Sequence, residues 1–153
     1  MGNLLDLAEP NVKVALEEIP KATVKYSDKE WQSKLTKLEY KVCRKKGTEE
    51  PYTGEYHDHK EKGVYTCKCC NTILFDSKDK YESFTGWPSF SHFAFPKRIG
   101  VKYDTSYKML RKEVICTVCH AHLGHVFHDG PPPYGKRYCM NSVSLDFKPA
   151  DNS

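Results

Sequence analysis

The sequence predicts a mainly β domain with a short helical N-terminal lead. Two observations indicate this class: one amphipathic helical pattern lies near the start, and short strand-like runs bounded by turn residues follow it. At 153 residues, the chain has the length of one domain that buries its own core. We expect an N-terminal arm over residues 1–26, the domain over 27–149 and a C-terminal tail over 150–153.

The helical lead is expected to begin after Ser27. Ser27 and Glu30 form a capping-box pattern, in which each side chain binds the backbone amide of the other residue. The apolar residues that then recur at helical spacing are Trp31, Leu35, Leu38 and Val42. One helix over about residues 28–42, ended by Gly47, therefore follows from the pattern.

The strand-like runs begin after residue 63 and are separated by turn residues. They are Val64–Cys67, Thr72–Phe75, Val114–Val118 and Tyr138–Phe147. In the last run, Val143, Leu145 and Phe147 give one apolar face at a period of two. The stiff connection Pro131-Pro132-Pro133 precedes it.

Charge and hydropathy argue against several classes of function. The formal net charge is only +4 at pH 7, and the basic residues are scattered, so neither a nucleic acid nor a membrane surface is an expected partner. The N-terminus lacks the features of a secretory signal, and no apolar run is long enough to span a membrane. Seven cysteines without such a signal favour a reducing, cytoplasmic compartment, where cysteines serve as metal ligands or reactive thiols.

Four cysteines have the spacing of metal ligands. Cys67 and Cys70 form one Cys-x-x-Cys pair, and Cys116 and Cys119 form another. Two such pairs complete a tetrahedral thiolate shell, so we predict one structural zinc ion with no open coordination position. Redox-active pairs are the alternative, but neither pair opens a helix in a βαβ unit. Cys69 is expected to be a free thiol, although an exchange of roles with Cys70 stays open.

Cys139 is the candidate nucleophile. Arg137, Cys139 and Asn141 alternate on a predicted strand and so share a face. A guanidinium beside a thiol lowers the pKa of the thiol and favours the reactive thiolate. From these residues alone, a small buried apolar side chain remains the commoner role of such a cysteine.

Two histidines and one aromatic turn complete the candidate site. His122 and His125 follow the second cysteine pair and can donate a proton near neutral pH. Because the cysteines already fill the metal shell, a ligand role for the histidines is not expected. Trp87 lies in a rigid turn and forms either part of the core or one wall of an apolar pocket.

The segments that carry a resemblance to a known family follow one another in that family's order. They are Gly47-Thr48-Glu49, both Cys-x-x-Cys pairs, Gly86-Trp87-Pro88-Ser89-Phe90, His122-Leu123-Gly124-His125-Val126-Phe127, Asp129-Gly130-Pro131 and Arg137-Tyr138-Cys139-x-Asn141-Ser142. Over about residues 27–149, the chain resembles the methionine sulfoxide reductase B family. The resemblance implies two antiparallel sheets, with the zinc far from the catalytic cysteine.

The resemblance also implies a reaction. The expected enzyme reduces the R epimer of methionine sulfoxide, free or in oxidised proteins, and so repairs them. Cys139 attacks the sulfoxide sulfur and becomes a sulfenic acid, while His125, with His122 as its partner, supplies the proton. Trp87 borders the pocket for the methyl group, and Arg137 and Asn141 organise the thiolate. We expect a monomer that uses thioredoxin or a small thiol as reductant.

One position departs from the family pattern. Many members carry a resolving cysteine directly before the Gly-Trp-Pro-Ser-Phe turn, whereas this chain has Thr85 there. Recycling must then use an external thiol, Cys69 or Cys43. Cys43 is a candidate because Arg44 and the lysines after it would begin a mobile basic stretch that favours its thiolate.

Three other functions remain open from the sequence. A zinc-binding interaction module of the same fold would lack the thiol or the histidines, and both are present. A nucleic-acid-binding zinc ribbon would carry basic residues interleaved with aromatic ones near its Cys-x-x-Cys pairs. Here Lys68 is the only basic residue inside either pair. A thiol peroxidase would be distinguished by competition between peroxide and methionine sulfoxide.

Overall fold

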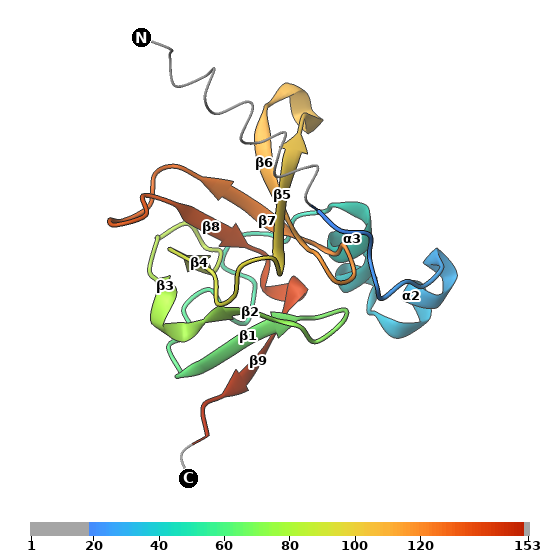
Figure 1. Ribbon diagram of the computed structural model, residues 1–153, viewed down its shortest axis with the longest axis horizontal. Helices are drawn as coiled ribbons and strands as arrows, with labels where there is room; N and C mark the ends of the chain where they lie inside the picture. Colours follow the sequence, from blue (N-terminus) through green and yellow to red (C-terminus); the bar gives the residue numbers. More distant parts are fainter. Residues whose placement is uncertain (1–18, 152–153) are drawn as a thin grey trace.

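The computed structural model describes residues 19–151. Two short helices precede two antiparallel sheets, which confirms the predicted mainly β fold (Figure 1). The sheets have the strand orders β2-β1-β9 and β3-β4-β8-β7-β6-β5. The elements are α2 (Asp28–Lys34), α3 (Lys37–Lys45), β1 (Gly63–Cys67), β2 (Ile73–Asp76), β3 (Lys80–Tyr81), β4 (Ser89–Phe90), β5 (Ile99–Asp104), β6 (Arg111–Cys116), β7 (His122–Phe127), β8 (Arg137–Met140) and β9 (Leu145–Pro149).

The prediction of one helix over residues 28–42 was wrong, because the chain breaks at Leu35 and Thr36. The capping box at Ser27 forms as expected, but Thr36 and Glu39 form a second one that starts α3. The Thr36 hydroxyl accepts from the Glu39 amide at 3.2 Å, and the Glu39 carboxylate accepts from the Thr36 amide at 2.9 Å. Leu38, which the helical periodicity placed on the buried face, is 46% exposed.

The predicted strand over residues 138–147 was also wrong. The chain leaves the larger sheet at the end of β8, makes a 3₁₀ turn over Ser142–Ser144, and enters the smaller sheet as β9. The Glu49 carboxylate accepts from the Val143 amide at 2.9 Å, and the Ser144 hydroxyl donates to the His122 carbonyl at 2.9 Å. These two tertiary bonds hold the turn, and the alternation of residues 138–147 gives no sign of them.

The other predicted strands exist with shifted ends, as β1, β2 and β6. The longer strands that sequence reasoning missed are β5 and β7. In β7, five of the six residues are buried, so polar and apolar residues do not alternate between solvent and core. Strand prediction depends on alternation of apolar and polar residues, or on a continuous apolar run. β7 shows neither, because two of its buried residues are histidines.

Stacked aromatic rings join the two sheets. Phe75 of β2 stacks on Phe90 of β4 with ring centroids 4.3 Å apart, and Tyr65 of β1 meets Phe90 edge-on at 5.1 Å. All three rings are fully buried. Rings of this size dominate core energetics, so this cluster fixes how the sheets lie against each other.

The part of the expected N-terminal arm that the structure describes packs on the domain. The amides of Thr23 and Val24 both donate to the Val118 carbonyl, at 2.9 and 3.0 Å. Residues 1–18 of the arm and residues 152–153 of the tail lie outside the described range. Within residues 19–151, neither helix has the length and apolar character needed to cross a bilayer.

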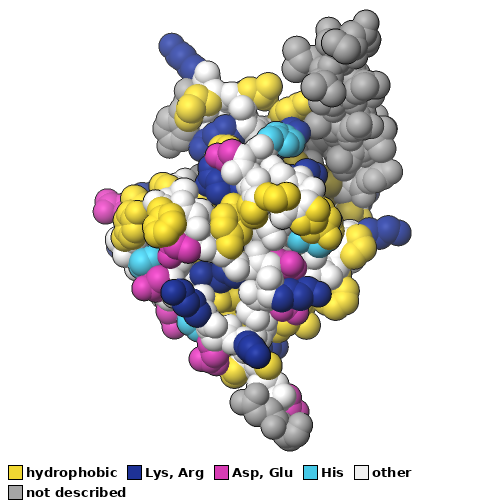
Figure 2. All heavy atoms as spheres, turned by 90° about the vertical axis from the view of Figure 1, so that its left-hand side faces the viewer, with side chains coloured by type: hydrophobic (Ala, Val, Ile, Leu, Met, Phe, Trp, Pro, Cys, Tyr) yellow, Lys and Arg dark blue, Asp and Glu magenta, His cyan; other side chains and the backbone are white. Residues whose placement is uncertain are grey.

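One face of the molecule carries mixed charge. On the face shown in Figure 2, basic and acidic side chains are interspersed with small groups of hydrophobic ones. Such a mixture does not form the continuous basic patch by which nucleic-acid-binding proteins are recognised.

Candidate functional site

The four predicted ligand cysteines converge on one point. Cys67 and Cys70 flank the turn after β1, and Cys116 and Cys119 flank the turn after β6. Their sulfur atoms all lie within 4.8 Å of one another, with 3.6 Å between Cys67 and Cys119 and between Cys70 and Cys116. Thiolates at about 2.3 Å from a tetrahedral zinc ion would be about 3.8 Å apart, so the cluster fits a metal ion. Because one turn belongs to each sheet, a metal here would tie the two sheets together.

Of the two remaining thiols near this cluster, Cys69 agrees with the expectation and Cys43 does not. Cys69 is not part of the four-sulfur group, so the structure assigns the ligand position to Cys70. The expectation that a mobile basic stretch begins directly after Cys43 was wrong, because α3 continues through Lys45, and Cys43 itself is 2% exposed. A hydrogen bond with Cys69 and then burial raise the pKa of Cys43, and the charge of Arg44 does not reverse this.

A separate pocket of about 240 Å³ collects most of the other predicted site residues. Its lining includes Trp87, His125, Arg137, Cys139 and Asn141. Thr85 also lines it, which places the turn before Trp87 beside the thiol, as the family resemblance implied. His122 does not line the pocket but lies against His125, with ring centroids 5.3 Å apart.

Strand pairing brings Cys139 and His125 onto one face of the larger sheet. Cys139 of β8 pairs directly with His125 of β7, and His125 pairs on its other side with Glu113 of β6. Directly opposed residues of antiparallel strands have Cβ atoms about 5 Å apart and side chains on the same face. The imidazole of His125 is therefore a near neighbour of the thiol.

An irregularity in β7 accounts for the proximity of the two histidines. His122 and His125 are three residues apart and would point to opposite faces of a regular strand. The pairing of β6 with β7 shifts register here, from Val114 opposite Gly124 to Ile115 opposite His122. Such bulges re-aim side chains beside active sites. Gly124 is required at this point, because a Cβ atom there would collide with the Cys139 carbonyl.

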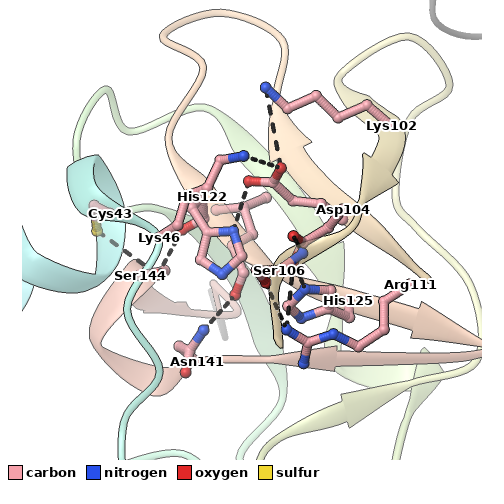
Figure 3. A network of polar contacts seen from close by, with 12 residues as sticks. Cys43, Lys46, Lys102, Asp104, Ser106, Arg111, His122, His125, Asn141 and Ser144 are labelled. Atoms are coloured by element: carbon pink, nitrogen blue, oxygen red, sulfur yellow. Dashed lines mark hydrogen bonds and ion pairs between the residues drawn. The ribbon is translucent and has the colours of Figure 1, made fainter. Parts of the chain in front are cut away.

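Each histidine has a buried carboxylate partner (Figure 3). The Asp104 carboxylate lies 2.8 Å from Nε2 of His125, and the Glu113 carboxylate lies 2.7 Å from Nδ1 of His122. Lys46 reaches the other oxygen of Glu113 at 3.3 Å. Sequence reasoning missed both acids, since no spacing motif links them to the histidines. A sequence analysis that recognised β6 and β7 as paired strands, in the correct register, would have placed Glu113 opposite His125.

The electrostatics of Cys139 differ from the sequence-based expectation. Burial raises the pKa of the Cys139 thiol, and the nearby Arg137 guanidinium and the Thr85 hydroxyl offset only part of that effect. The Arg137 guanidinium also binds Asp129: its Nε and Nη2 donate to the Asp129 carboxylate at 2.9 and 3.1 Å. Its guanidinium also lies 4.5 Å from the centre of the Phe127 ring. The sequence anticipated the direction of the Arg137 effect but not the larger opposing effect of burial.

Asn141 and Trp87 both anchor the loop at Glu49. The Asn141 side chain accepts from the Glu49 amide at 3.0 Å and donates to the Leu123 carbonyl at 3.1 Å. Nε1 of Trp87 donates to the Glu49 carbonyl at 3.0 Å. These bonds hold the indole in place as a wall of the pocket and connect β7, the loop and β8.

Comparison with known proteins gives one consistent result. The chain matches the SelR domain over residues 35–149. A protein of Hahella chejuensis is 55% identical over 84% of this chain and 92% of its own length, and one of Methanosarcina barkeri is 56% identical over 82% and 88%. One of Pseudomonas putida is 53% identical over 81% and 93%. All three are named peptide methionine sulfoxide reductase MsrB.

Proposed function

The chain belongs to the SelR-domain family of peptide methionine sulfoxide reductases, and on that basis we propose that it reduces the R epimer of methionine sulfoxide through a cysteine sulfenic acid. The substrate is free or lies within an oxidised protein, and the catalytic unit spans residues 27–149. The observation that carries this proposal is the direct pairing of Cys139 with His125, both of which line one pocket.

The reaction balances with the thiol and the sulfoxide alone. The Cys139 sulfur attacks the sulfoxide sulfur, the sulfur–oxygen bond of the substrate breaks, and the oxygen ends on Cys139 as a sulfenic acid. Cys139 is oxidised by two electrons and the substrate sulfur is reduced by two. The thiol hydrogen becomes the hydrogen of the sulfenic acid, so a group beside both sulfurs must hold a proton in transit. We assign this role to His125, which lines the pocket together with Cys139 and contacts the ring of His122.

The pocket lining supports a methyl sulfoxide as substrate. Trp87 and Phe127 provide apolar surface for the methyl group, while Arg137 provides a cation beside the sulfur that carries charge during attack. Asn141 acts through the backbone bonds that hold this wall together. A pocket of about 240 Å³ accommodates one side chain, so the rest of a protein substrate would lie outside it.

We propose zinc as the metal of the four-cysteine cluster. Four thiolates in tetrahedral array are the typical donor set of structural zinc, and they leave no position for water or substrate. The residues that would hold it are Cys67, Cys70, Cys116 and Cys119. A metal held there would have no open position for chemistry at Cys139 and would instead join the two sheets.

The proposed activity predicts a strict preference between epimers. Purified protein is incubated separately with the R and S epimers of N-acetylmethionine sulfoxide and with dithiothreitol, and the methionine derivative formed is measured. We expect turnover of the R epimer and none of the S epimer above background. Equal use of both epimers would contradict the stereochemical assignment. Preference for hydrogen peroxide in direct competition would instead favour a thiol peroxidase.

We further propose that the enzyme acts as a monomer and that an external thiol, thioredoxin or a small thiol, reduces the sulfenic acid. Thr85 cannot form the disulfide that a resolving cysteine would form, and Cys43 is buried with a raised pKa. After one turnover without reductant, mass spectrometry should therefore find a dimedone adduct on Cys139. A disulfide from Cys139 to Cys43 or to Cys69 in place of the adduct would refute the external route.

The same experiment on Thr85→Cys tests the position of this residue. Because Thr85 lines the same pocket as Cys139, a cysteine there should capture the sulfenic acid as an internal disulfide and suppress the adduct. Cys43→Ala is the matched control and should keep the adduct. An undiminished adduct in Thr85→Cys would show that the turn moves away from Cys139 during catalysis.

A further inference from the structure

We propose that Asp104 is a positioning residue of the reaction, whose carboxylate fixes the tautomer of His125 and leaves Nδ1 of that ring for the Cys139 thiol. This inference rests on the proposed function and adds a residue to it. Asp104 ends β5 and lies 21 positions from His125 in the chain, with β6 between their strands.

The Asp104 carboxylate is held by donors from several directions. One oxygen accepts from Nε2 of His125 at 2.8 Å, and Nη2 of Arg111 lies 3.4 Å from that same oxygen. The other oxygen accepts from the Ser106 amide at 2.9 Å. The side chains of Asp104 and His125 are only 8% and 10% exposed, so water does not compete effectively for these bonds. Figure 3 shows the Arg111 guanidinium and the imidazole converging on this carboxylate.

This arrangement decides which ring nitrogen carries hydrogen. Burial opposes ionisation of Asp104, but hydrogen bonds from His125 and Ser106 outweigh it and hold the pKa of the carboxyl well below its usual range. An ionised carboxylate can only accept, so Nε2 of His125 must be the protonated nitrogen. In the neutral ring, Nδ1 then has a lone pair and no hydrogen.

A neutral His125 with a free Nδ1 suits a proton relay from Cys139. Burial lowers the pKa of His125, and the charges of Arg111 and His122 add to that effect, while Asp104 opposes it. The ring is therefore neutral at neutral pH, and the buried thiol has a raised pKa and keeps its proton. Nδ1 can accept that proton as the sulfur attacks. Nδ1 then passes this proton to the substrate oxygen as the sulfur–oxygen bond breaks.

The other charged groups around His125 have different partners. Glu113 faces His125 across the strand pair, but its carboxylate binds His122 and Lys46. Arg137 approaches from β8 and binds Asp129. Asp104 is accordingly the acid whose oxygen lies at hydrogen-bond distance from the His125 ring.

The tautomer can be measured directly on the wild-type, metal-loaded protein. Nitrogen-15 NMR of labelled histidine side chains distinguishes a protonated ring nitrogen from one with a lone pair, and His125→Gln assigns the signals. At neutral pH we expect a neutral His125 ring with hydrogen on Nε2. Hydrogen on Nδ1 in the resting enzyme would overturn the proposal, whatever the variants below do.

Kinetics of Asp104→Asn test the consequence. We expect kcat to fall on the order of 10²-fold with little change in KM, because general acid–base catalysis contributes about 10²–10⁴. Loss of the negative charge lowers the pKa of His125 further, so the acidic limb of the kcat/KM profile, where His125 becomes protonated, should move to lower pH. Asp104→Glu, which restores the charge, should return the limb towards its original position.

The controls separate the possible failures. Asp146→Asn removes a carboxylate that binds Lys68 at 2.6 Å, and it should change neither kcat nor the pH profile. A purely structural role of Asp104 would lower kcat at every pH without moving the acidic limb, which would refute the proposal. If the wild type does not reduce the R sulfoxide, the proposed function itself fails. If the wild type is active and Asp104→Asn is unchanged, only the positioning role fails.

Discussion

Replacing Cys139 by serine is expected to abolish the reductase activity and leave the fold intact. The reaction requires a sulfur that forms a bond to the substrate and then carries its oxygen, and a hydroxyl oxygen cannot become a sulfenic acid. Loss of a nucleophile typically costs more than about 10⁴-fold in kcat. The side chain lines the pocket and takes no part in joining the sheets, so stability should change little.

The measurement is methionine formation from the R epimer with dithiothreitol present, together with a thermal unfolding curve for each variant. Cys69→Ser is the matched control, because it also removes a free thiol but lies outside both the pocket and the four-cysteine cluster. The control should keep its activity. Substantial turnover by Cys139→Ser, at more than a few per cent of wild type, would refute the assignment of the nucleophile.

Replacing Cys116 by serine is expected to release the metal and destabilise the whole domain. Cys116 is fully buried at the end of β6, and its sulfur lies 3.6 Å from that of Cys70 in the other half of the cluster. Structural zinc contributes on the order of 10–16 kcal/mol of apparent binding free energy that is coupled to folding. Because this exceeds the free energy of unfolding of many domains, about 5–15 kcal/mol, the variant should be largely unfolded.

Elemental analysis of the wild type should give one zinc ion per chain, and circular dichroism should report the loss of folded structure in Cys116→Ser. Cys69→Ser again serves as the control and should retain the metal, because its sulfur is not one of the converging four. A stable and active Cys116→Ser variant, or a wild type that contains no zinc, would contradict the prediction.

The sequence by itself determined those features that depend on residues close together in the chain. The capping box at Ser27 and Glu30 forms because both partners lie within one helical turn. Each Cys-x-x-Cys pair places its two sulfurs on one side of a tight turn, so the four-cysteine cluster could be expected once two pairs were present. The mainly β class followed in the same way from short runs between turn residues.

Knowledge of the family added what local patterns do not contain. The residues around Cys139 left a buried, inert thiol as the commoner alternative, and only the order of several motifs pointed to a nucleophile. That assignment remains a prediction, which the pairing of Cys139 with His125 supports.

The tertiary structure alone decided the environment of the site. Asp104 and Glu113 reach the histidines because β5, β6 and β7 pair side by side, and such pairing joins residues that no fixed spacing relates. The break at Thr36 and the change of sheet after β8 had the same origin, since hydrogen bonds outweighed the hydrophobic period in both places. Cys43 and Cys139 both have a raised pKa, although their neighbouring arginines suggested the reverse. A hydrogen bond with Cys69 and then burial raise the pKa of Cys43, and burial raises that of Cys139. Desolvation depends on how the whole chain packs around a group. For that reason the sequence could predict candidate residues for the site, whereas the directions of their pKa shifts depend on the fold.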